Sequence, residues 1–101
     1  MKLTKEVILQ TLKENKKEIR KFGVENITLF GSYAKDLQNE NSDIDFLVQF
    51  RKNRGNYRDK LDLLHFLEDL FDKKIDIGTQ ENIRDSLKPH ILGDTKYETR
   101  V

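Results

Sequence analysis

Apolar positions recur at helical spacing in three parts of the chain. Thr4 can cap the amino end of a first helix, whose apolar residues continue to Gly23, a residue suited to ending a helix. Apolar positions from Leu61 to Phe71 predict a second, amphipathic helix of about fourteen residues. A last helix is expected around residues 80–92. Helices of this kind need another layer of structure to cover their apolar faces.

The segments between these helices have the composition of strands. In the run after residue 42, apolar and acidic residues alternate, so Ile44 and Phe46 project from one face and Asp43 and Asp45 from the other. Alternating helices and strands predict an α/β fold with a small mixed β-sheet flanked by helices. The sequence leaves the order of the strands open. The expected strands are residues 26–30, 43–50 and 74–77.

Length and composition favour one small domain. The 101 residues allow a modest core, but not a catalytic domain together with an independent recognition domain. Charged residues make up 37% of the chain and apolar residues 36%, which predicts a heavily charged surface around a small interior. We expect the domain to occupy residues 1–93 and a polar tail to follow at 94–101.

The balance of charge argues against one class of function. Lys and Arg number 19 against 18 Asp and Glu, a net charge of +1, so direct nucleic-acid binding is not expected. The basic cluster within residues 13–21 is interpreted as a solvated helix face. The basic loop at 51–58 leaves an alternative open, namely salt-dependent binding of RNA or DNA.

The absence of certain residues and runs is also informative. The chain has no Cys, which excludes a disulfide, a thiolate site and a Cys-type zinc site. His65 lies among apolar helix residues and His90 has no neighbouring Cys or His, so neither is predicted to bind metal. No apolar run approaches the length of a membrane span, so a cytoplasmic protein without a membrane partner is expected.

The first strand leads into Gly31 and Ser32, a pair suited to a tight turn. Glycine adopts backbone torsions closed to other residues, and the amides that follow it can face an anion. Residues 32–37 could form a short helix whose amino end faces the same anion. Tyr33 would then stack on a ligand or face solvent. The turn therefore predicts phosphate binding, although ordinary turns use the same pair of residues.

Asp43 and Asp45 lie two residues apart on one strand face, where they can hold one divalent cation. Asp76 is a third carboxylate between apolar neighbours. If its strand lies beside the second strand, the three carboxylates converge, and their repulsion raises their pKa values unless a cation neutralises them. We therefore predict one or two Mg²⁺ ions bound together with triphosphate oxygens. Arg51, directly after the second strand, either contacts the triphosphate or is solvated.

These residues resemble the catalytic signature of the nucleotidyltransferase superfamily typified by DNA polymerase beta. The order matches: Gly31-Ser32 after an apolar run, then Asp43-Ile44-Asp45, then Asp76 between apolar residues. The short chain resembles the minimal nucleotidyltransferase (MNT) group, often the antitoxin half of HEPN–MNT toxin–antitoxin pairs. Where that family commonly has Arg-Gly, this chain has Lys35-Asp36. Lys35 keeps the positive charge, and Asp tolerates left-handed backbone torsions better than most residues.

The resemblance implies Mg²⁺-dependent transfer of AMP from ATP to a protein hydroxyl. The implied acceptor is a tyrosine of a cognate HEPN ribonuclease toxin, which would make the chain an antitoxin that works in complex with that partner. The catalytic and metal-binding residues that it implies are Asp43, Asp45 and Asp76. The nucleotide-binding residues that it implies are Gly31, Ser32 and Lys35.

Two alternatives remain open at this point. The domain could transfer a nucleotide to a small molecule or to another protein. It could also be a non-catalytic antitoxin that neutralises its partner by binding alone. The sequence does not indicate the preferred base, the number of nucleotides transferred, the oligomeric state, or whether Lys35-Asp36 alters activity.

Overall fold

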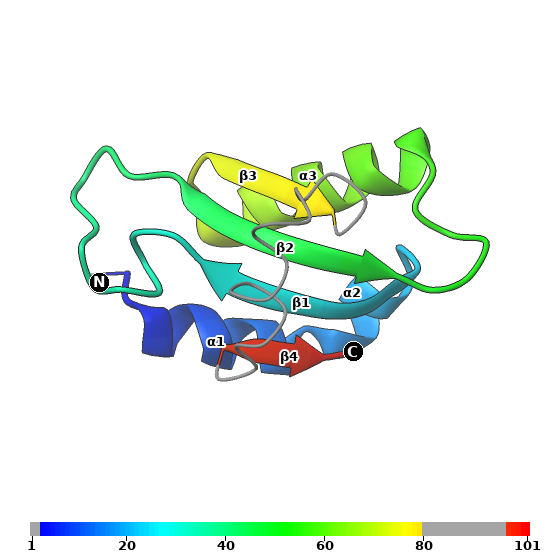
Figure 1. Ribbon diagram of the computed structural model, residues 1–101, viewed down its shortest axis with the longest axis horizontal. Helices are drawn as coiled ribbons and strands as arrows, with labels where there is room; N and C mark the ends of the chain where they lie inside the picture. The colour runs from blue at the N-terminus through cyan, green and yellow to red at the C-terminus, as the bar shows by residue number, and fades with distance from the viewer. Residues whose placement is uncertain (1–2, 80–96) are drawn as a thin grey trace, which may run out of the picture.

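The computed structural model describes residues 3–79 and 97–101, in which helices and strands follow one another broadly as expected (Figure 1). The helix expected at 80–92 lies outside the described residues. None of the described helices is long and apolar enough to cross a membrane. The elements are α1 (Lys5–Glu14), α2 (Lys16–Arg20), β1 (Val24–Phe30), β2 (Ile44–Phe50), α3 (Tyr57–Phe71), β3 (Ile75–Thr79) and β4 (Glu98–Arg100).

The four strands form one mixed sheet in the order β3-β2-β1-β4. β1 is antiparallel to both β2 and β4, whereas β2 and β3 are parallel. The predicted mixed sheet is therefore confirmed. α3 forms the long crossover that a parallel pair of strands requires. As a result, β2 and β3 start at the same end of the sheet, the end at which β1 stops.

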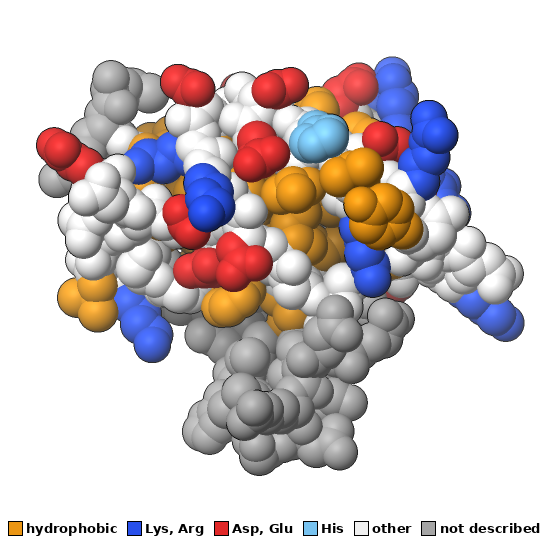
Figure 2. Space-filling view, turned by 90° about the horizontal axis from the view of Figure 1, so that it is seen from above, with side chains coloured by type: hydrophobic (Ala, Val, Ile, Leu, Met, Phe, Trp, Pro, Cys, Tyr) orange, Lys and Arg blue, Asp and Glu red, His pale blue; other side chains and the backbone are white. Residues whose placement is uncertain are grey.

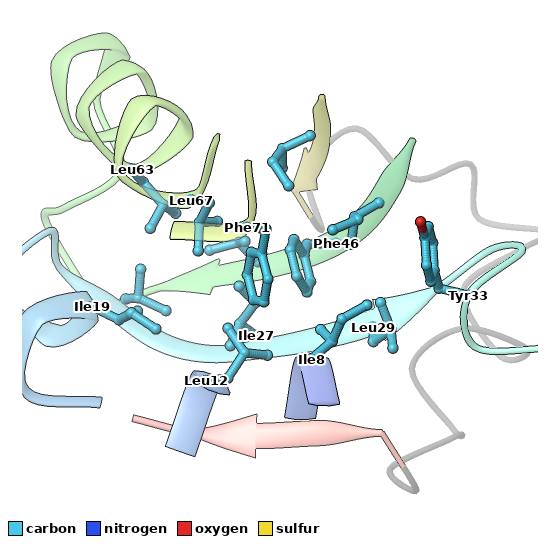
Figure 3. Packing of buried hydrophobic residues seen from close by; sticks show 14 of the residues in the cluster. Ile8, Leu12, Ile19, Ile27, Leu29, Tyr33, Phe46, Leu63, Leu67 and Phe71 are labelled. Atoms are coloured by element: carbon cyan, nitrogen blue, oxygen red, sulfur yellow. The ribbon is translucent and has the colours of Figure 1, made fainter. Parts of the chain in front are cut away.

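The helices cover one face of the sheet, behind the strands in Figure 1. Side chains from all three helices pack against that face, and Figure 3 shows them meeting those of β1 and β2. Leu29 and its partner Phe46 are among the buried residues, with 1% and 0% of their surface exposed. The next pair along, Phe30 and Asp45, projects from the opposite face. The period-two pattern of β2 thus separates core residues from candidate site residues.

The first helical segment is two helices, not one, because the backbone leaves helical geometry at Asn15. Thr4 caps α1 as predicted, accepting a hydrogen bond of 3.3 Å from the amide of Val7. At the break, the Asn15 side chain donates to the carbonyl oxygen of Thr11 at 2.8 Å. Asn side chains compete in this way for backbone groups that would otherwise continue a helix. Ile19 in α2 is nevertheless fully buried, so both helices cover the core.

The expectation of a polar tail at 94–101 is wrong for Glu98–Arg100, which forms the edge strand β4. Its residues pair with the middle of β1 over Asn26–Thr28. Thr99 and Val101 are buried, with 3% and 8% of their surface exposed. The charged residues of this segment led to the expectation of a tail. Edge strands nevertheless commonly carry charge, because it discourages pairing with other chains.

α3 confirms the second predicted helix, with 15 residues. The Asn56 side chain caps its amino end by accepting a hydrogen bond of 2.8 Å from the amide of Asp59. Leu63, Leu67 and Phe71 are its buried residues, at the spacing of one helix face. Packing of this face against the sheet sets β3 beside β2.

Candidate active site

The predicted carboxylates come from the starts of two neighbouring strands. Asp45 in β2 is the register partner of Asp76 in β3, so both project from the face away from the helices. Asp43 precedes β2 by one residue. On the other side of β2, Asp45 pairs with Phe30 at the end of β1, so the turn at Gly31 starts beside the same carboxylate. The sequence-based condition for convergence, β3 next to β2, is met.

Asp45 is in an electrostatically unfavourable position. Partial burial raises its pKa, and the negative charges of Asp76 and Asp43 raise that pKa further. In the described part of the chain, no three His, Asp or Glu side chains already stand as a ligand cage for a metal ion. Carboxylate oxygens are nevertheless the ligands that Mg²⁺ prefers, and a cation here would relieve the cost of ionising Asp45. The residues present therefore fit a divalent cation.

Gly31 is required by two features of its position. Its φ of +77° lies in the left-handed region that side chains disfavour. A Cβ at this residue would also collide with the Oδ2 atom of Asp45. Glycine thus lets the backbone of the turn approach the carboxylate more closely than any other residue would.

The short helix expected at 32–37 is wrong, because this segment is a series of turns. The amide of Lys35 donates to the carbonyl oxygens of Gly31 and Ser32, at 3.3 and 3.2 Å, and the amide of Leu37 donates to that of Ser32 at 2.9 Å. Asp36 then takes a left-handed φ of +58°, which ends any helical continuation. The expected tolerance of Asp for such torsions is borne out at this position.

A basic side chain from α1 holds the turn from outside. Lys5 forms an ion pair of 3.0 Å with Asp36, and its ammonium group lies 3.5 Å from the hydroxyl of Tyr97 and 5.4 Å from the centre of that ring. The hydrogen bond to Asp36, and then that to Tyr97, raises the pKa of Lys5. Sequence reasoning missed this contact, which joins three segments far apart in the chain. Asp36 therefore gives the turn an anchor that glycine would lack.

Ser32, Lys35 and Tyr33 have different environments within the turn. Ser32 is partly exposed and Lys35 is exposed, so both are accessible to a ligand. Neither of the two interpretations of Tyr33 is correct, because only 2% of its surface is exposed and its ring belongs to the core (Figure 3). Lys73 lies 6.0 Å from the centre of that ring. Tyr33 therefore anchors the turn to the hydrophobic core.

Arg51 lies at the wrong end of β2 to contact a triphosphate held at Asp45. The seven residues of β2 place it about 20 Å from that end of the sheet. Its guanidinium group donates to the carbonyl oxygen of Val101 at 3.4 Å, and the residue is exposed. The solvated interpretation of Arg51 is therefore the better one. His65 is exposed on α3.

A cavity of about 420 Å³ adjoins the turn. It shares Tyr33 and the loop from β1 to β2 with the candidate site. The Oε1 atom of Gln38 is buried without a hydrogen-bond partner at its wall. The residues that line it are Leu3, Tyr33, Gln38, Asn39, Glu40 and Lys73.

Proteins of similar sequence carry names that concern nucleotide transfer. MJ1379 of Methanocaldococcus jannaschii, provisionally named a protein adenylyltransferase, is 38% identical over 93 residues, which cover 89% of this chain and 93% of that protein. The protein adenylyltransferase MntA of Thermococcus cleftensis is 32% identical over 96 residues, which cover 94% of this chain and 96% of MntA.

Solved structures share the fold. One that is provisionally described as a minimal nucleotidyltransferase has a TM-score of 0.70 at 26% identity, over 92% of this chain and 95% of that chain. A toxin–antitoxin complex with AMP-PNP has a TM-score of 0.60 at 23% identity, over 97% of this chain and 72% of that chain. A model of the nucleotidyltransferase domain matches residues 8–101. The carboxylate pair beside a glycine turn is thus found in a chain that belongs to the nucleotidyltransferase domain family.

Proposed function

We propose that this chain transfers AMP from ATP to a hydroxyl group of a partner protein. The observation that carries the proposal is the register of Asp45 with Asp76, next to a turn where Asp45 leaves no room for a side chain at Gly31. A protein acceptor is supported by the name protein adenylyltransferase, which MntA of Thermococcus cleftensis bears. A nucleotide substrate is supported by the family match and by the AMP-PNP complex of similar fold.

Each residue of the site has a proposed role in binding. The amides after Gly31 and the hydroxyl of Ser32 bind phosphate oxygens of ATP, and exposed Lys35 adds a positive charge beside them. Asp43 and Asp45 would hold Mg²⁺, and Asp76 would be the further ligand where a second ion binds. Bound Mg²⁺ supplies neutralisation of the charge that grows on the triphosphate during transfer.

The proposed reaction is an in-line displacement. The hydroxyl oxygen of the acceptor forms a bond to the α-phosphorus, the bond from that phosphorus to the bridging oxygen breaks, and pyrophosphate leaves. Where no second ion is bound, Asp76 has a different role: the proton of the hydroxyl passes to its carboxylate oxygen, which is exposed and lies in register with Asp45. Most of the catalysis then comes from positioning and from charge neutralisation.

The proposed acceptor is a tyrosine of a cognate HEPN ribonuclease toxin in the cytoplasm, so the chain would act as its antitoxin. A toxin–antitoxin complex is among the similar folds, which supports a toxin as partner. AMP on the toxin adds bulk and negative charge, which would hinder binding of RNA. A small-molecule acceptor and neutralisation by binding alone are the alternatives to be tested.

The test is intact mass spectrometry of a cognate HEPN toxin after incubation with this chain, ATP and Mg²⁺. We expect a mass gain of one or more AMP units, lost when Mg²⁺ is chelated. The double variant Asp43→Asn, Asp45→Asn should give none. Asp69→Asn removes a carboxylate from an exposed position of α3 and should behave as wild type.

Two results would separate the alternatives. Tight binding and neutralisation of the toxin by the double variant, without any mass change in wild type, would establish a binding antitoxin. Release of pyrophosphate with a small-molecule acceptor, but not with the toxin, would establish a different substrate class.

A further inference from the structure

Two basic clusters that are separate in the sequence meet at the end of the sheet opposite the carboxylates. One lies within residues 13–21, in α1 and α2, and the other within residues 51–58, between β2 and the start of α3. The amide of Arg51 donates to the carbonyl oxygen of Gly23 at 2.8 Å. The guanidinium group of Arg54 donates to the carbonyl oxygen of Lys21 at 3.0 Å. These bonds hold the clusters side by side, and we call the surface that they form the basic end.

The basic end has a surplus of positive charge that the structure does not neutralise. The first cluster has five basic residues and the second has four, all of them exposed. Ion pairs engage Lys21 with Glu18, Arg54 with Asp59 and Arg58 with Asp62. Six residues of the basic end form no ion pair within the described part of the chain: Lys13, Lys16, Lys17, Arg20, Arg51 and Lys52.

The net charge of +1 therefore hides a polarised distribution. Figure 2 shows Lys and Arg side chains gathered on the right, at the end of the molecule where α3 begins. The candidate active site, with its carboxylates, lies at the other end of β2. The total charge led to the expectation that the chain does not bind nucleic acid. A polyanion, however, responds to the local electrostatic field, which is positive at the basic end.

An exposed aromatic ring stands within the basic end. Tyr57 is the first residue of α3, and 80% of its surface is exposed. In the described part of the chain, the other large hydrophobic residue that is exposed is Leu37, which lies in the loop after the turn. The capping bond of Asn56 fixes the start of the helix and so the backbone of Tyr57. An aromatic ring on a rigid backbone among cations is the arrangement on which unpaired bases stack.

We propose that the basic end binds single-stranded RNA, with Lys and Arg side chains holding phosphates and Tyr57 stacking on a base. A single strand is favoured over a duplex because a duplex offers no free base face to the ring. The distance along β2, about 20 Å, separates this site from the carboxylates. RNA bound there is thus a ligand distinct from ATP, and the proposal does not depend on nucleotide transfer.

The test is fluorescence anisotropy with a labelled single-stranded RNA of about eight nucleotides. We expect binding whose affinity falls between about 50 and 200 mM salt with a logarithmic slope of about −3, the value for four neutralised phosphates. The variant Tyr57→Ala should weaken binding about 5-fold or more, whereas Tyr57→Phe keeps the ring and should bind as wild type.

Charge-reversal variants provide a matched control. Lys17→Glu with Lys52→Glu takes one residue from each cluster and should reduce affinity at least about 10-fold and flatten the salt slope. Lys74→Glu reverses a charge at the carboxylate end, outside the proposed ATP-binding turn, and should leave RNA affinity within about 2-fold, whereas Lys52→Glu alone should weaken binding more than that. Thermal unfolding checks that the three exposed positions tolerate the change. The proposal is overturned if Lys52→Glu and Lys74→Glu weaken binding alike, if duplex RNA binds as tightly, or if no RNA binds at low salt.

Discussion

Asp45 and Asp59 are two partly buried aspartates, each beside a glycine, at opposite ends of the molecule. Asp59 accepts two hydrogen bonds of 3.0 Å from Arg54 and one of 2.9 Å from the amide of Gly55. Arg54 first, and then the Gly55 amide, lower the pKa of Asp59. Asp45 has carboxylates as its charged neighbours, and its pKa is raised.

The difference separates a carboxylate that stabilises the fold from one that we propose to bind a cation. The charge of Asp59 is compensated by groups of the chain itself, so its ionised form favours folding. The described residues supply no such compensation to Asp45, and its ionised form opposes folding until a cation binds. Perturbed carboxylates of the second kind are typical of functional sites.

The largest effect is expected from Asp45→Asn. Loss of a carboxylate that we propose to hold Mg²⁺ should lower the rate of AMP transfer by about three orders of magnitude. The same change removes repulsion with Asp76 and Asp43, so thermal stability should stay equal or rise. Transfer kinetics and a melting curve measure both. A melting temperature well below that of wild type would assign Asp45 a structural role instead.

The next effect is expected from Gly31→Ala. The new Cβ collides with Asp45 and requires a disfavoured torsion, so stability should fall by about 1–3 kcal/mol and activity by about 100-fold. Gly78→Ala is the matched control, because a Cβ there would lie 3.8 Å from Leu47, an ordinary contact. Denaturant unfolding and transfer assays compare the two. Equal behaviour of both variants would contradict the proposed need for glycine in the turn.

A smaller effect is expected from Asp59→Asn, at about 1 kcal/mol of unfolding free energy near neutral pH. The folded pKa of Asp59 lies below its unfolded value of about 3.9, so its stabilisation is present above that value and is lost as pH falls through the folded pKa. Wild type and variant should therefore converge in stability in acid.

The pH dependence of stability that comes from Asp45 has the opposite sign. Its raised pKa costs stability at neutral pH, and this stability is regained as pH falls toward the unfolded pKa. Unfolding curves at several pH values measure both trends, and a constant gap between wild type and Asp59→Asn would refute the first.

The smallest effect is expected from the partly exposed ion pair between Lys5 and Asp36, which anchors the turn. Lys5→Met should raise the KM for ATP by about 2- to 5-fold with little change in kcat, because the turn is positioned less firmly. Asp36→Gly keeps the left-handed torsion and should give the same result, and the double variant should add nothing. Steady-state kinetics measure this split. Additive losses in the double variant would show that the two residues act separately.

The sequence predicted those parts of the molecule in which local pattern decides geometry. Alternation in β2 assigned Asp43 and Asp45 to the face opposite Phe46, and Thr4 was recognised as a cap. The convergence of Asp76 needed only that β3 lie beside β2. Each of these features depends either on residues within a single helix or strand, or on which strand lies next to another in the sheet.

The features that were missed depend on contacts between distant segments. Tyr33 belongs to a buried hydrophobic cluster whose other members, such as Ile8 and Phe46, come from distant segments, and nothing in its neighbours in sequence signals that. The strand at Glu98–Arg100 is specified by the free edge of β1 rather than by its own residues. The meeting of two basic clusters depends in the same way on where β1 begins and β2 ends.

The shortness of β4 has a consequence for local unfolding of the molecule. It pairs with β1 through three residues at the sheet edge, so it is expected to detach at lower free energy than the central strands. Tyr97 precedes it, accepting a bond of 3.1 Å from the amide of Leu29 while its ring lies beside Lys5. Each detachment would loosen Lys5 and, through it, the turn at Asp36. Fast hydrogen exchange at the amide of Val101, which donates to the carbonyl oxygen of Glu25 at 2.9 Å, would report how often β4 detaches and so how often the turn at Asp36 loses its outer support.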